Sequence, residues 1–236
     1  MDLRLGQGVR PVNQLAGEPV LVVGAGGHAF SVIDTLECQG RHRVVGLLVN
    51  DSPVDRAVRG YRVLGSVSEL ATVAQATGCQ AVIVTIGDNY QRQRVSAKVR
   101  SLLPDAHFIS AIHPSAVISS TARVGQGVVI LAGAVVNCGT EIGEGCLINS
   151  RASVDHDCTL EAFSSVAPGA TLGGNVVVGQ RSSVGLGAAV VHRISIGADT
   201  VIGAGAVVVA DQEAGIVAFG SPCRMVRTRA ANAPYL

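Results

Sequence analysis

Aromatic side chains are nearly missing from this sequence, because Phe, Trp and Tyr together make up only 3% of it and Trp is absent. Hydrophobic residues nevertheless reach 48%, and Gly occurs 29 times. A core built almost wholly from Val, Ile, Leu and Ala needs a repetitive, closely spaced backbone, which is typical of a solenoid. The length of 236 residues allows one large or two modest domains.

A strong charge of either sign is also missing, since the formal net charge is +1. This balance gives no electrostatic reason to expect nucleic acid or an anionic membrane surface as a partner. No stretch of about 20 apolar residues lacks a polar interruption, so the sequence predicts no transmembrane helix. The six cysteines form no Cys-x-x-Cys pair, and residues 1–18 contain no continuous apolar run. We therefore expect a cytoplasmic protein with reduced thiols and no disulfide framework.

A six-residue repeat dominates the second half of the chain. Residues 113–208 divide into sixteen hexads without insertion, and the sixth residue of every hexad is aliphatic. A mostly small residue stands two positions earlier, and Gly recurs near the hexad starts. Such hexads indicate a left-handed parallel β-helix, in which three hexads form one triangular coil. The sixth positions are Ile118, Val124, Ile130, Val136, Ile142, Ile148, Val154, Leu160, Val166, Leu172, Val178, Val184, Val190, Ile196, Ile202 and Val208.

The geometry of such a coil assigns a place to each residue. The aliphatic side chain points inward, the small one lies beside it, and Gly relieves the tight corner. Positions eighteen apart share one edge in successive coils, which stack at about 4.8 Å.

Strand-like and helix-like segments alternate before the repeat. Strands are expected at Val20–Val23, Arg43–Val49 and Ala81–Ile86, with helical stretches ending at Gly40 and Thr77 and another over Asp88–Leu103. This βαβ pattern predicts a small, partly parallel sheet with a ligand crevice at the carboxyl ends of its strands. We predict four segments: a flexible arm over 1–17, a small Rossmann-like α/β domain over 18–110, the β-helix over 111–210, and a C-terminal segment over 211–236.

A glycine-rich turn at residues 24–27 fits the pattern G-x-G-x-x-A between the first strand and helix. The domain is short for a full dinucleotide fold, and no acid clearly ends the second strand. Backbone N–H groups at a helix start hold a phosphate well, so a nucleoside diphosphate fits better than NAD. A tight strand–helix turn without a ligand is the alternative.

His156 is the candidate general base, because it stands between Asp155 and Asp157 and a neighbouring carboxylate can hold the imidazole tautomer. Spacing does not assign the supporting aspartate, since adjacent strand residues point apart unless a corner turns them. A solvated corner histidine among acids is the alternative. Gly174, one coil beyond, is expected to leave room for a cofactor arm. His192 lies two coils away, about 10 Å, which is too far to share a metal ion with His156.

Over residues 19–229 the chain resembles the bacterial sugar O-/N-acyltransferases, which include sialic acid O-acetyltransferases and UDP-4-amino-sugar N-acetyltransferases. The matching segments are 23–29, 86–89, 112–116, 149–158 and 220–224. The resemblance implies a homotrimer that uses acetyl-CoA, bound between neighbouring β-helices, and no metal. It also implies that residues 18–110 bind a nucleotide-linked sugar, whose amino or hydroxyl group is acetylated for cell-surface polysaccharide.

The family's functional positions can be placed on this sequence. The resemblance implies that His156 is the general base and that Asp157 raises its basicity. Positions matching nucleotide-sugar contacts are Gly26, Gly27, His28, Gly87 and Asn149, and positions matching acetyl-CoA contacts are Ser165, Gly174, Leu186 and Ala204. Two departures stand out: some relatives carry a second histidine where this chain has Ser165, and paired acids where it has Val49-Asn50 before Asp51.

The expected mechanism is direct attack of the acceptor on the thioester, without an acyl-enzyme. A cysteine nucleophile is the covalent alternative, although Cys146 and Cys158 occupy inward positions, which leaves Cys138 on the edge of His156. Two other functions remain open: a zinc hydratase of the γ-carbonic anhydrase kind, and a non-catalytic nucleotide-sugar-binding protein. The former needs three converging histidines.

Overall fold

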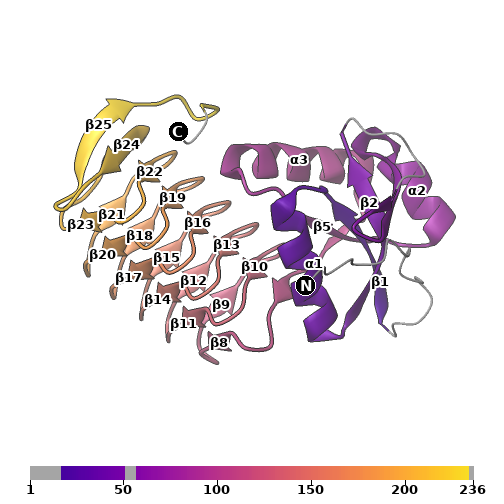
Figure 1. The fold of residues 1–236 in the computed structure, drawn as a ribbon, viewed down its shortest axis with the longest axis horizontal. Coiled ribbons are helices and arrows are strands. Elements are labelled where there is room, and N and C mark those ends of the chain that lie inside the picture. The colour runs from indigo at the N-terminus through magenta and orange to yellow at the C-terminus, as the bar shows by residue number, and fades with distance from the viewer. Residues whose placement is uncertain (1–16, 51–56, 234–236) are drawn as a thin grey trace, which may run out of the picture. The chain divides into compact units, whose positions relative to one another are not determined.

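The computed structural model describes residues 17–50 and 57–233, and the chain forms two compact units (Figure 1). The first unit falls within residues 1–86 and 95–108, and the second comprises 87–94 and 109–236. The predicted arm over 1–17 lies almost wholly outside the described residues, as does Asp51. The predicted domain boundaries stay a prediction, because compactness does not test which segments fold on their own.

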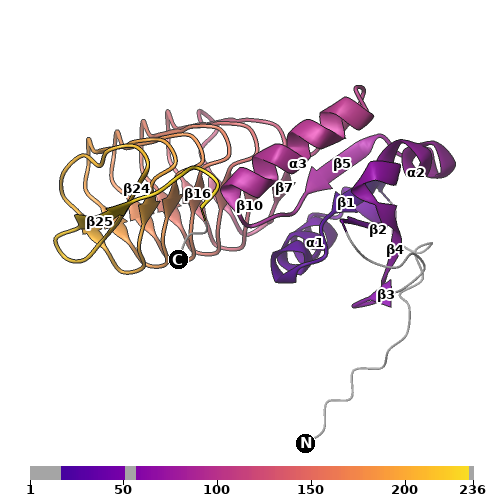
Figure 2. The same ribbon diagram turned by 90° about the horizontal axis from the view of Figure 1, so that it is seen from above.

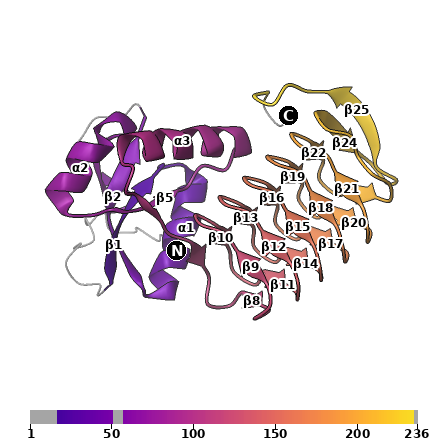
Figure 3. The same cartoon turned by 180° about the vertical axis from the view of Figure 1, so that it is seen from behind.

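The first unit is a six-stranded sheet with helices. Its sheet order is β3-β4-β2-β1-β5-β6, and all neighbours are parallel except β3 and β4. Helix α1 packs against β2 (Figure 3), and α2 packs against β4. The elements are β1 Glu18–Val23, α1 Gly27–Gln39, β2 His42–Val49, β3 Ala57–Val58, β4 Tyr61–Ser66, the 3-10 turn η1 Val67–Glu69, α2 Leu70–Thr77, β5 Ala81–Val84, α3 Asn89–Leu102 and β6 His107–Phe108. The start of α3, up to Arg94, belongs to the second unit.

The local sequence explains these elements. Val20–Val23 and Ala81–Val84 are buried aliphatic runs that form the adjacent inner strands β1 and β5, as expected for parallel strands covered on both faces. Ser66 begins η1 with a capping box, in which its side chain and that of Glu69 satisfy each other's backbone N–H groups. The predicted third strand ends at Val84, two residues earlier than expected.

The second unit is a parallel β-helix. Seventeen two-residue strands alternate with turns and form three sheets: sheet I (β7, β10, β13, β16, β19, β22, β24, β25), sheet II (β8, β11, β14, β17, β20, β23) and sheet III (β9, β12, β15, β18, β21). The strands are β7 Ala111–Ile112, β8 Val117–Ile118, β9 Arg123–Val124, β10 Val129–Ile130, β11 Val135–Val136, β12 Glu141–Ile142, β13 Leu147–Ile148, β14 Ser153–Val154, β15 Thr159–Leu160, β16 Ser165–Val166, β17 Thr171–Leu172, β18 Val177–Val178, β19 Ser183–Val184, β20 Ala189–Val190, β21 Ser195–Ile196, β22 Val201–Ile202 and β23 Val207–Val208, followed by β24 Ile216–Phe219 and β25 Arg224–Thr228.

The register confirms the hexad pattern. Each short strand pairs in parallel with the strand eighteen residues further on, as Val129 pairs with Leu147 and Leu147 with Ser165. The sixth hexad residues form the core: all are at most 4% exposed except Ile118 and Val124, which pack against the core at its first coil. The predicted fold class, a small Rossmann-like domain followed by a left-handed parallel β-helix, is therefore confirmed.

The last coil differs from the others. Val201 of β22 pairs with Val217 of β24, which is only sixteen residues further on. Strand β25 then pairs with β24 in the antiparallel direction and closes this end of the stack (Figure 2). All five residues of β25 are exposed.

Two further observations concern the whole described chain. All six cysteines are free, and Cys146 and Cys158 lie in the core as their hexad positions predict. Among residues 17–50 and 57–233, no helix has both the length and the hydropathy that a membrane crossing requires.

Candidate active site

The turns between the sheets form three ridges along the β-helix. Ridge I–II contains residues such as 149–152 and 185–188, ridge II–III contains 137–140, 155–158 and 173–176, and ridge III–I contains 143–146, 161–164, 179–182 and 197–200. Because the coils are in register, residues eighteen apart lie above one another on a ridge. Each predicted site residue can therefore be located by naming its ridge and its coil.

His156 and Asp157 form a hydrogen-bonded pair on ridge II–III. The Nδ1 atom of His156 lies 2.8 Å from Oδ2 of Asp157, and both side chains are about half exposed. Asp157 has a φ of 56°, a left-handed conformation that Asp tolerates better than most residues. This turn brings its carboxylate alongside the imidazole of the preceding residue. The aspartate that spacing alone left unassigned is thus Asp157.

Asp155 contacts the same histidine through the backbone. Its Oδ1 atom accepts the backbone N–H of His156 at 2.8 Å and the side-chain amide of Asn137 at 2.9 Å. These two hydrogen bonds, the one from Asn137 first, hold the pKa of the Asp155 carboxyl below its usual value. Sequence reasoning missed Asn137, although it lies eighteen residues before Asp155 and hence directly beside it in the stack.

The two aspartates set the electrostatics of the imidazole. The hydrogen bond that Nδ1–H of His156 donates to Asp157 raises the pKa of His156 above its ordinary value of 6.5, and the charges of Asp155 and Asp157 add to this effect. With Nδ1 engaged by a carboxylate, the neutral ring carries its proton on Nδ1 and its lone pair on Nε2. His156 can therefore accept a proton at Nε2.

Gly174 lies one coil beyond His156, as the hexad register predicts, and the imidazole lies against it. A Cβ atom built on Gly174 would meet Nε2 of His156 at 2.5 Å and Cε1 at 2.6 Å. The space is thus occupied by the imidazole itself. Cys138 and His192, on the same edge, are both exposed.

The other positions matched to acetyl-CoA contacts lie away from this ridge. Leu186 and Ala204 occupy the same place in successive coils of ridge I–II and are exposed. Asn149, matched to a sugar contact, also lies on ridge I–II. Ser165 is 5% exposed in β16, and its hydroxyl is hydrogen-bonded to Asn89 and to Ser183. Within one chain the structure therefore groups Leu186 with Ala204, and His156 with Gly174. The binding roles of these residues stay predictions.

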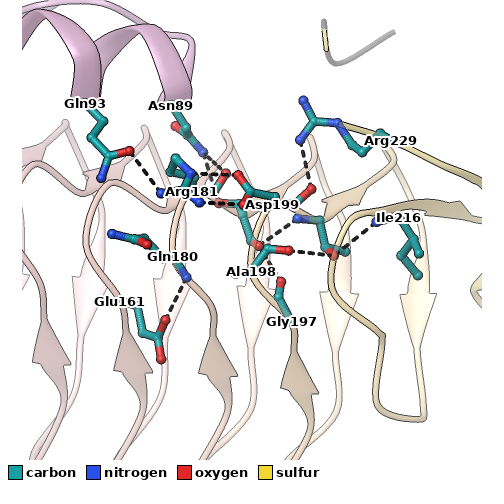
Figure 4. Close-up of polar contacts among 12 residues, drawn as sticks. Asn89, Gln93, Glu161, Gln180, Arg181, Gly197, Ala198, Asp199, Ile216 and Arg229 are labelled. Atoms are coloured by element: carbon teal, nitrogen blue, oxygen red, sulfur yellow. Dashed lines mark hydrogen bonds and ion pairs between the residues drawn. The ribbon is translucent and has the colours of Figure 1, made fainter. Parts of the chain in front are cut away.

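Ridge III–I is covered by the beginning of α3. The buried guanidinium of Arg92 donates to the carbonyl oxygens of Gly145 and Phe163, which are eighteen residues apart. Figure 4 shows Asn89 and Gln93 approaching Arg181, whose guanidinium forms an ion pair with Asp199.

Sequence reasoning did not identify these contacts. They join the start of a predicted helix to turns 53 to 93 residues further along the chain.

The glycine turn of the first unit lies at the carboxyl end of β1. Gly24 is required by the fold, because it has a φ of +123° and a Cβ there would meet Oγ1 of Thr85 at 2.7 Å. No described atom lies within 4 Å of a Cβ built on Gly26 or Gly27. Gly26 caps α1, Gly27 and His28 begin it, and no acidic residue stands in its first turn. These backbone N–H groups form the kind of surface that binds phosphate.

Gly87 follows β5, the strand that pairs with β1, by three residues. A Cβ on it likewise meets no described atom within 4 Å. The sheet order changes direction at β1 and β5, since β2 lies on one side of β1 and β5 on the other. Such a switch point is where open α/β sheets bind ligands.

The groups that the alternative chemistries would use can also be located. Burial raises the pKa of the Cys146 and Cys158 thiols, which opposes thiolate formation. In the part of the chain that the structure describes, no three His, Cys, Asp or Glu side chains are grouped to hold a metal ion. An open depression of about 380 Å³ on sheet III, beside Arg123 and Glu141, contains none of the predicted site residues.

Several known proteins are similar to this chain over most of its length or over its first unit. Residues 19–99 match the PglD N-terminal domain family. A solved structure of GDP-perosamine N-acetyltransferase from Caulobacter crescentus, in complex with CoA and GDP-perosamine, is 39% identical, with 90% of this chain and 99% of that chain covered and a TM-score of 0.85. The acetyltransferase domain of PglB from Neisseria gonorrhoeae, in complex with acetyl coenzyme A, is 32% identical, with 89% and 100% covered and a TM-score of 0.80.

WeeI from Acinetobacter baumannii shares the fold at 22% identity, with 89% of this chain and 100% of that chain covered and a TM-score of 0.79. A search of curated protein sequences found no match.

Proposed function

Since this chain belongs to the bacterial sugar O-/N-acyltransferases of the hexapeptide-repeat superfamily, we propose that it transfers the acetyl group of acetyl-CoA to an amino group of a nucleotide-linked sugar. The observation that carries the proposal is the His156–Asp157 pair, which engages Nδ1 and leaves Nε2 as the proton acceptor. Two similar solved proteins, at 39% and 32% identity, are acetyltransferases in complex with CoA or acetyl coenzyme A. A hydroxyl group of the sugar is the alternative acceptor, and substrate tests must distinguish it from the amino group.

The chemistry needs no covalent enzyme intermediate. The acceptor nitrogen attacks the thioester carbonyl while Nε2 of His156 takes one of its protons. The tetrahedral intermediate then collapses, the C–S bond breaks, and CoA leaves as the thiol after receiving a proton. Asp157 stabilises the imidazolium that exists between these proton transfers. Backbone N–H groups near the carbonyl stabilise the developing oxyanion.

We propose that the nucleotide-linked sugar is held by residues 18–110, at the carboxyl ends of β1 and β5. The start of α1 offers Gly26, Gly27 and His28, and Gly87 follows the neighbouring strand β5. The absence of side chains at the three glycines lets a diphosphate approach the backbone closely. Asn149 is the proposed sugar contact on the β-helix. The identity at 39% to a protein that is bound to GDP-perosamine supports a nucleoside-diphosphate amino sugar as the substrate class.

We further propose a homotrimer, and the ridges support it. Ridge III–I is occupied by α3 of the same chain. Of the remaining two, ridge II–III holds His156, and ridge I–II holds Leu186 and Ala204. A cyclic trimer uses a different surface on each side of every subunit. Ridge II–III of one subunit facing ridge I–II of the next would unite the base with the proposed acetyl-CoA contacts. A cytoplasmic location remains part of the proposal.

Release of the CoA thiol tests the activity. The purified protein is incubated with acetyl-CoA and a panel of nucleotide-linked amino and hydroxy sugars, and thiol is measured over time. We expect release with an amino sugar and none without an acceptor. Thiol release with hydroxy sugars alone would correct the acceptor group. No release with any sugar, together with stoichiometric zinc in the purified protein and hydratase activity, would replace the proposal by the γ-carbonic anhydrase alternative.

Mixing two inactive variants tests the shared site. His156→Ala lacks the base, and Ala204→Glu places a charge at the proposed acetyl-CoA contact. Each alone should be inactive, whereas random co-assembly into trimers should restore about one quarter of the sites. Failure to restore activity in verified mixed oligomers would locate the whole site in one chain.

A further inference from the structure

Gly174 occupies a hexad position that does not otherwise need glycine. It is the second residue of its hexad, and across residues 113–208 this position holds a side chain in every other hexad. Ala alone occurs there four times, and Gly174 is not among the glycines with a positive φ. The fifteen other residues are Pro114, Ser120, Gln126, Ala132, Cys138, Glu144, Ser150, His156, Ala162, Pro168, Gln180, Leu186, His192, Ala198 and Ala204. Neither the turn nor its backbone conformation therefore explains the glycine.

The neighbour of Gly174 does explain it. The three atoms nearest to a Cβ built there are Nε2, Cε1 and Cδ2 of His156, at 2.5, 2.6 and 3.1 Å. All three belong to one imidazole ring and none to the backbone. A methyl group at position 174 would thus displace the ring, while the coil itself would keep its course.

Gly139 is close to the Asp157 side chain in the same way that Gly174 is close to the His156 side chain. It lies eighteen residues before Asp157, and a Cβ built on it would overlap Oδ1 of Asp157. Its φ is +69°, yet equivalent turns accept other residues at similar angles, including Arg151 and Asn175. Gly133 provides a comparison, because its φ is +68° but its nearest described atom is Cγ of Arg151 at 3.5 Å.

We propose that Gly139 and Gly174 are positioning residues for the base. The carboxylate of Asp157 lies over the glycine of the preceding coil, and the imidazole of His156 lies against the glycine of the following coil. Filling either place breaks the 2.8 Å contact between Nδ1 and Oδ2 or turns Nε2 away from the acceptor. The proposal rests on the proposed function, since it gives the two glycines a role in holding the proton acceptor.

Gly174→Ala is the first test. We expect kcat to fall about 10²-fold, because a displacement of the base by about 1 Å has that effect, with a smaller change in KM for the sugar. Gly139→Ala should lower kcat and shift the acidic limb of the kcat/KM profile to lower pH, because Asp157 no longer raises the pKa of His156. Gly133→Ala is the matched control: it imposes the same backbone strain, and kcat and the pH profile should stay unchanged.

A double-mutant cycle separates positioning from structure. In a His156→Ala background the clash is removed, so Gly174→Ala should no longer lower Tm. Titration of the His156 ring by NMR provides a readout that needs no turnover, and its pKa should fall in Gly139→Ala but not in Gly133→Ala. Unchanged kcat in Gly174→Ala, or an equal loss of Tm in both backgrounds, would overturn the proposal. Full activity of His156→Ala would instead remove the base itself and so contradict the proposed function.

Discussion

Ridges II–III and III–I are built from the same turn but use it in opposite ways. On ridge III–I, Arg181 and Asp199 lie eighteen residues apart, both in the left-handed conformation, and form an ion pair whose side chains are 18% and 16% exposed. On ridge II–III, His156 and Asp157 are adjacent in sequence and form a pair that is 49% and 59% exposed. The difference follows from what covers each ridge: α3 shields the first.

This contrast shows how one repeated turn serves stability or chemistry. An ion pair between coils ties the stack together, and its groups are largely shielded from solvent. A pair within one turn does not itself link two coils, and it keeps one ring nitrogen available. Substitutions on the two ridges test this division of roles, beginning with the one that should change the protein most.

The largest effect is expected for His156→Ala. Loss of a general base should lower kcat by about 10²–10⁴-fold, while acetyl-CoA still binds and Tm stays near that of the parent protein. Thiol release and calorimetric binding of acetyl-CoA measure the two quantities. His192→Ala, on the same edge two coils further on, is the control and should retain full activity. Equal activity in both variants would show that ridge II–III is not the reactive ridge.

Arg92→Ala should have the largest effect on stability. The buried side chain donates to several carbonyl oxygens, including those of Gly145 and Phe163, and unpaired buried acceptors are costly. We expect the free energy of unfolding to fall by about 3 kcal/mol, measured by denaturant or thermal unfolding. Arg94→Ala, an exposed position on the same helix, should change it little. A similar loss in both variants would mean that the cover over ridge III–I does not depend on Arg92.

Asp199→Asn and Asp157→Asn should give opposite results. The first weakens the shielded ion pair with Arg181 and should lower the free energy of unfolding by about 1–2 kcal/mol, with kcat unchanged. The second should lower kcat and leave the unfolding transition in place. Unfolding curves and steady-state rates on both proteins check this pair. If Asp199→Asn lost activity instead, the shielded ridge would be part of the site.

The smallest effect is expected for Asp155→Asn. The amide can still accept from Asn137 and from the backbone N–H of His156, so the geometry should remain while the charge disappears. That charge helps to raise the pKa of His156. The base acts when unprotonated, so activity falls as pH drops through its pKa. Lowering this pKa should move the acidic limb of the kcat/KM profile to lower pH, with the plateau nearly unchanged. A shift to higher pH would contradict the assigned electrostatics.

The β-helix could be predicted from the sequence because the six-residue period of aliphatic residues recurs in every coil. Ile130, Val154 and Leu172 recur in step, and any other register would place them in water. The same period predicted the shared edge of His156 and Gly174. It did not assign the supporting aspartate, because left-handed turns in this repeat hold Asp, Asn, Arg or Gly alike. The structure identifies Asp157 through its contact with Nδ1.

The contacts on ridge III–I could not be predicted from the sequence for a different reason. Asn89 and Arg92 contact residues 53 to 93 positions away, and no local pattern encodes such a contact. The burial of Ser165 follows from it. The contact between Gly174 and the imidazole of His156 was not inferred either, and the role of Gly174 toward acetyl-CoA stays a prediction.

The sixteen-residue final coil also limits assembly. A stack of eighteen-residue coils has no intrinsic end, and an open last coil would template the addition of another molecule's strands, as exposed sheet edges do. Because β24 breaks the spacing and β25 runs antiparallel with Arg224 and Arg227 on it, the terminus no longer matches a first coil. The β-helix therefore has two unlike ends, and the end at β24 and β25 does not continue the eighteen-residue register that a further coil would need.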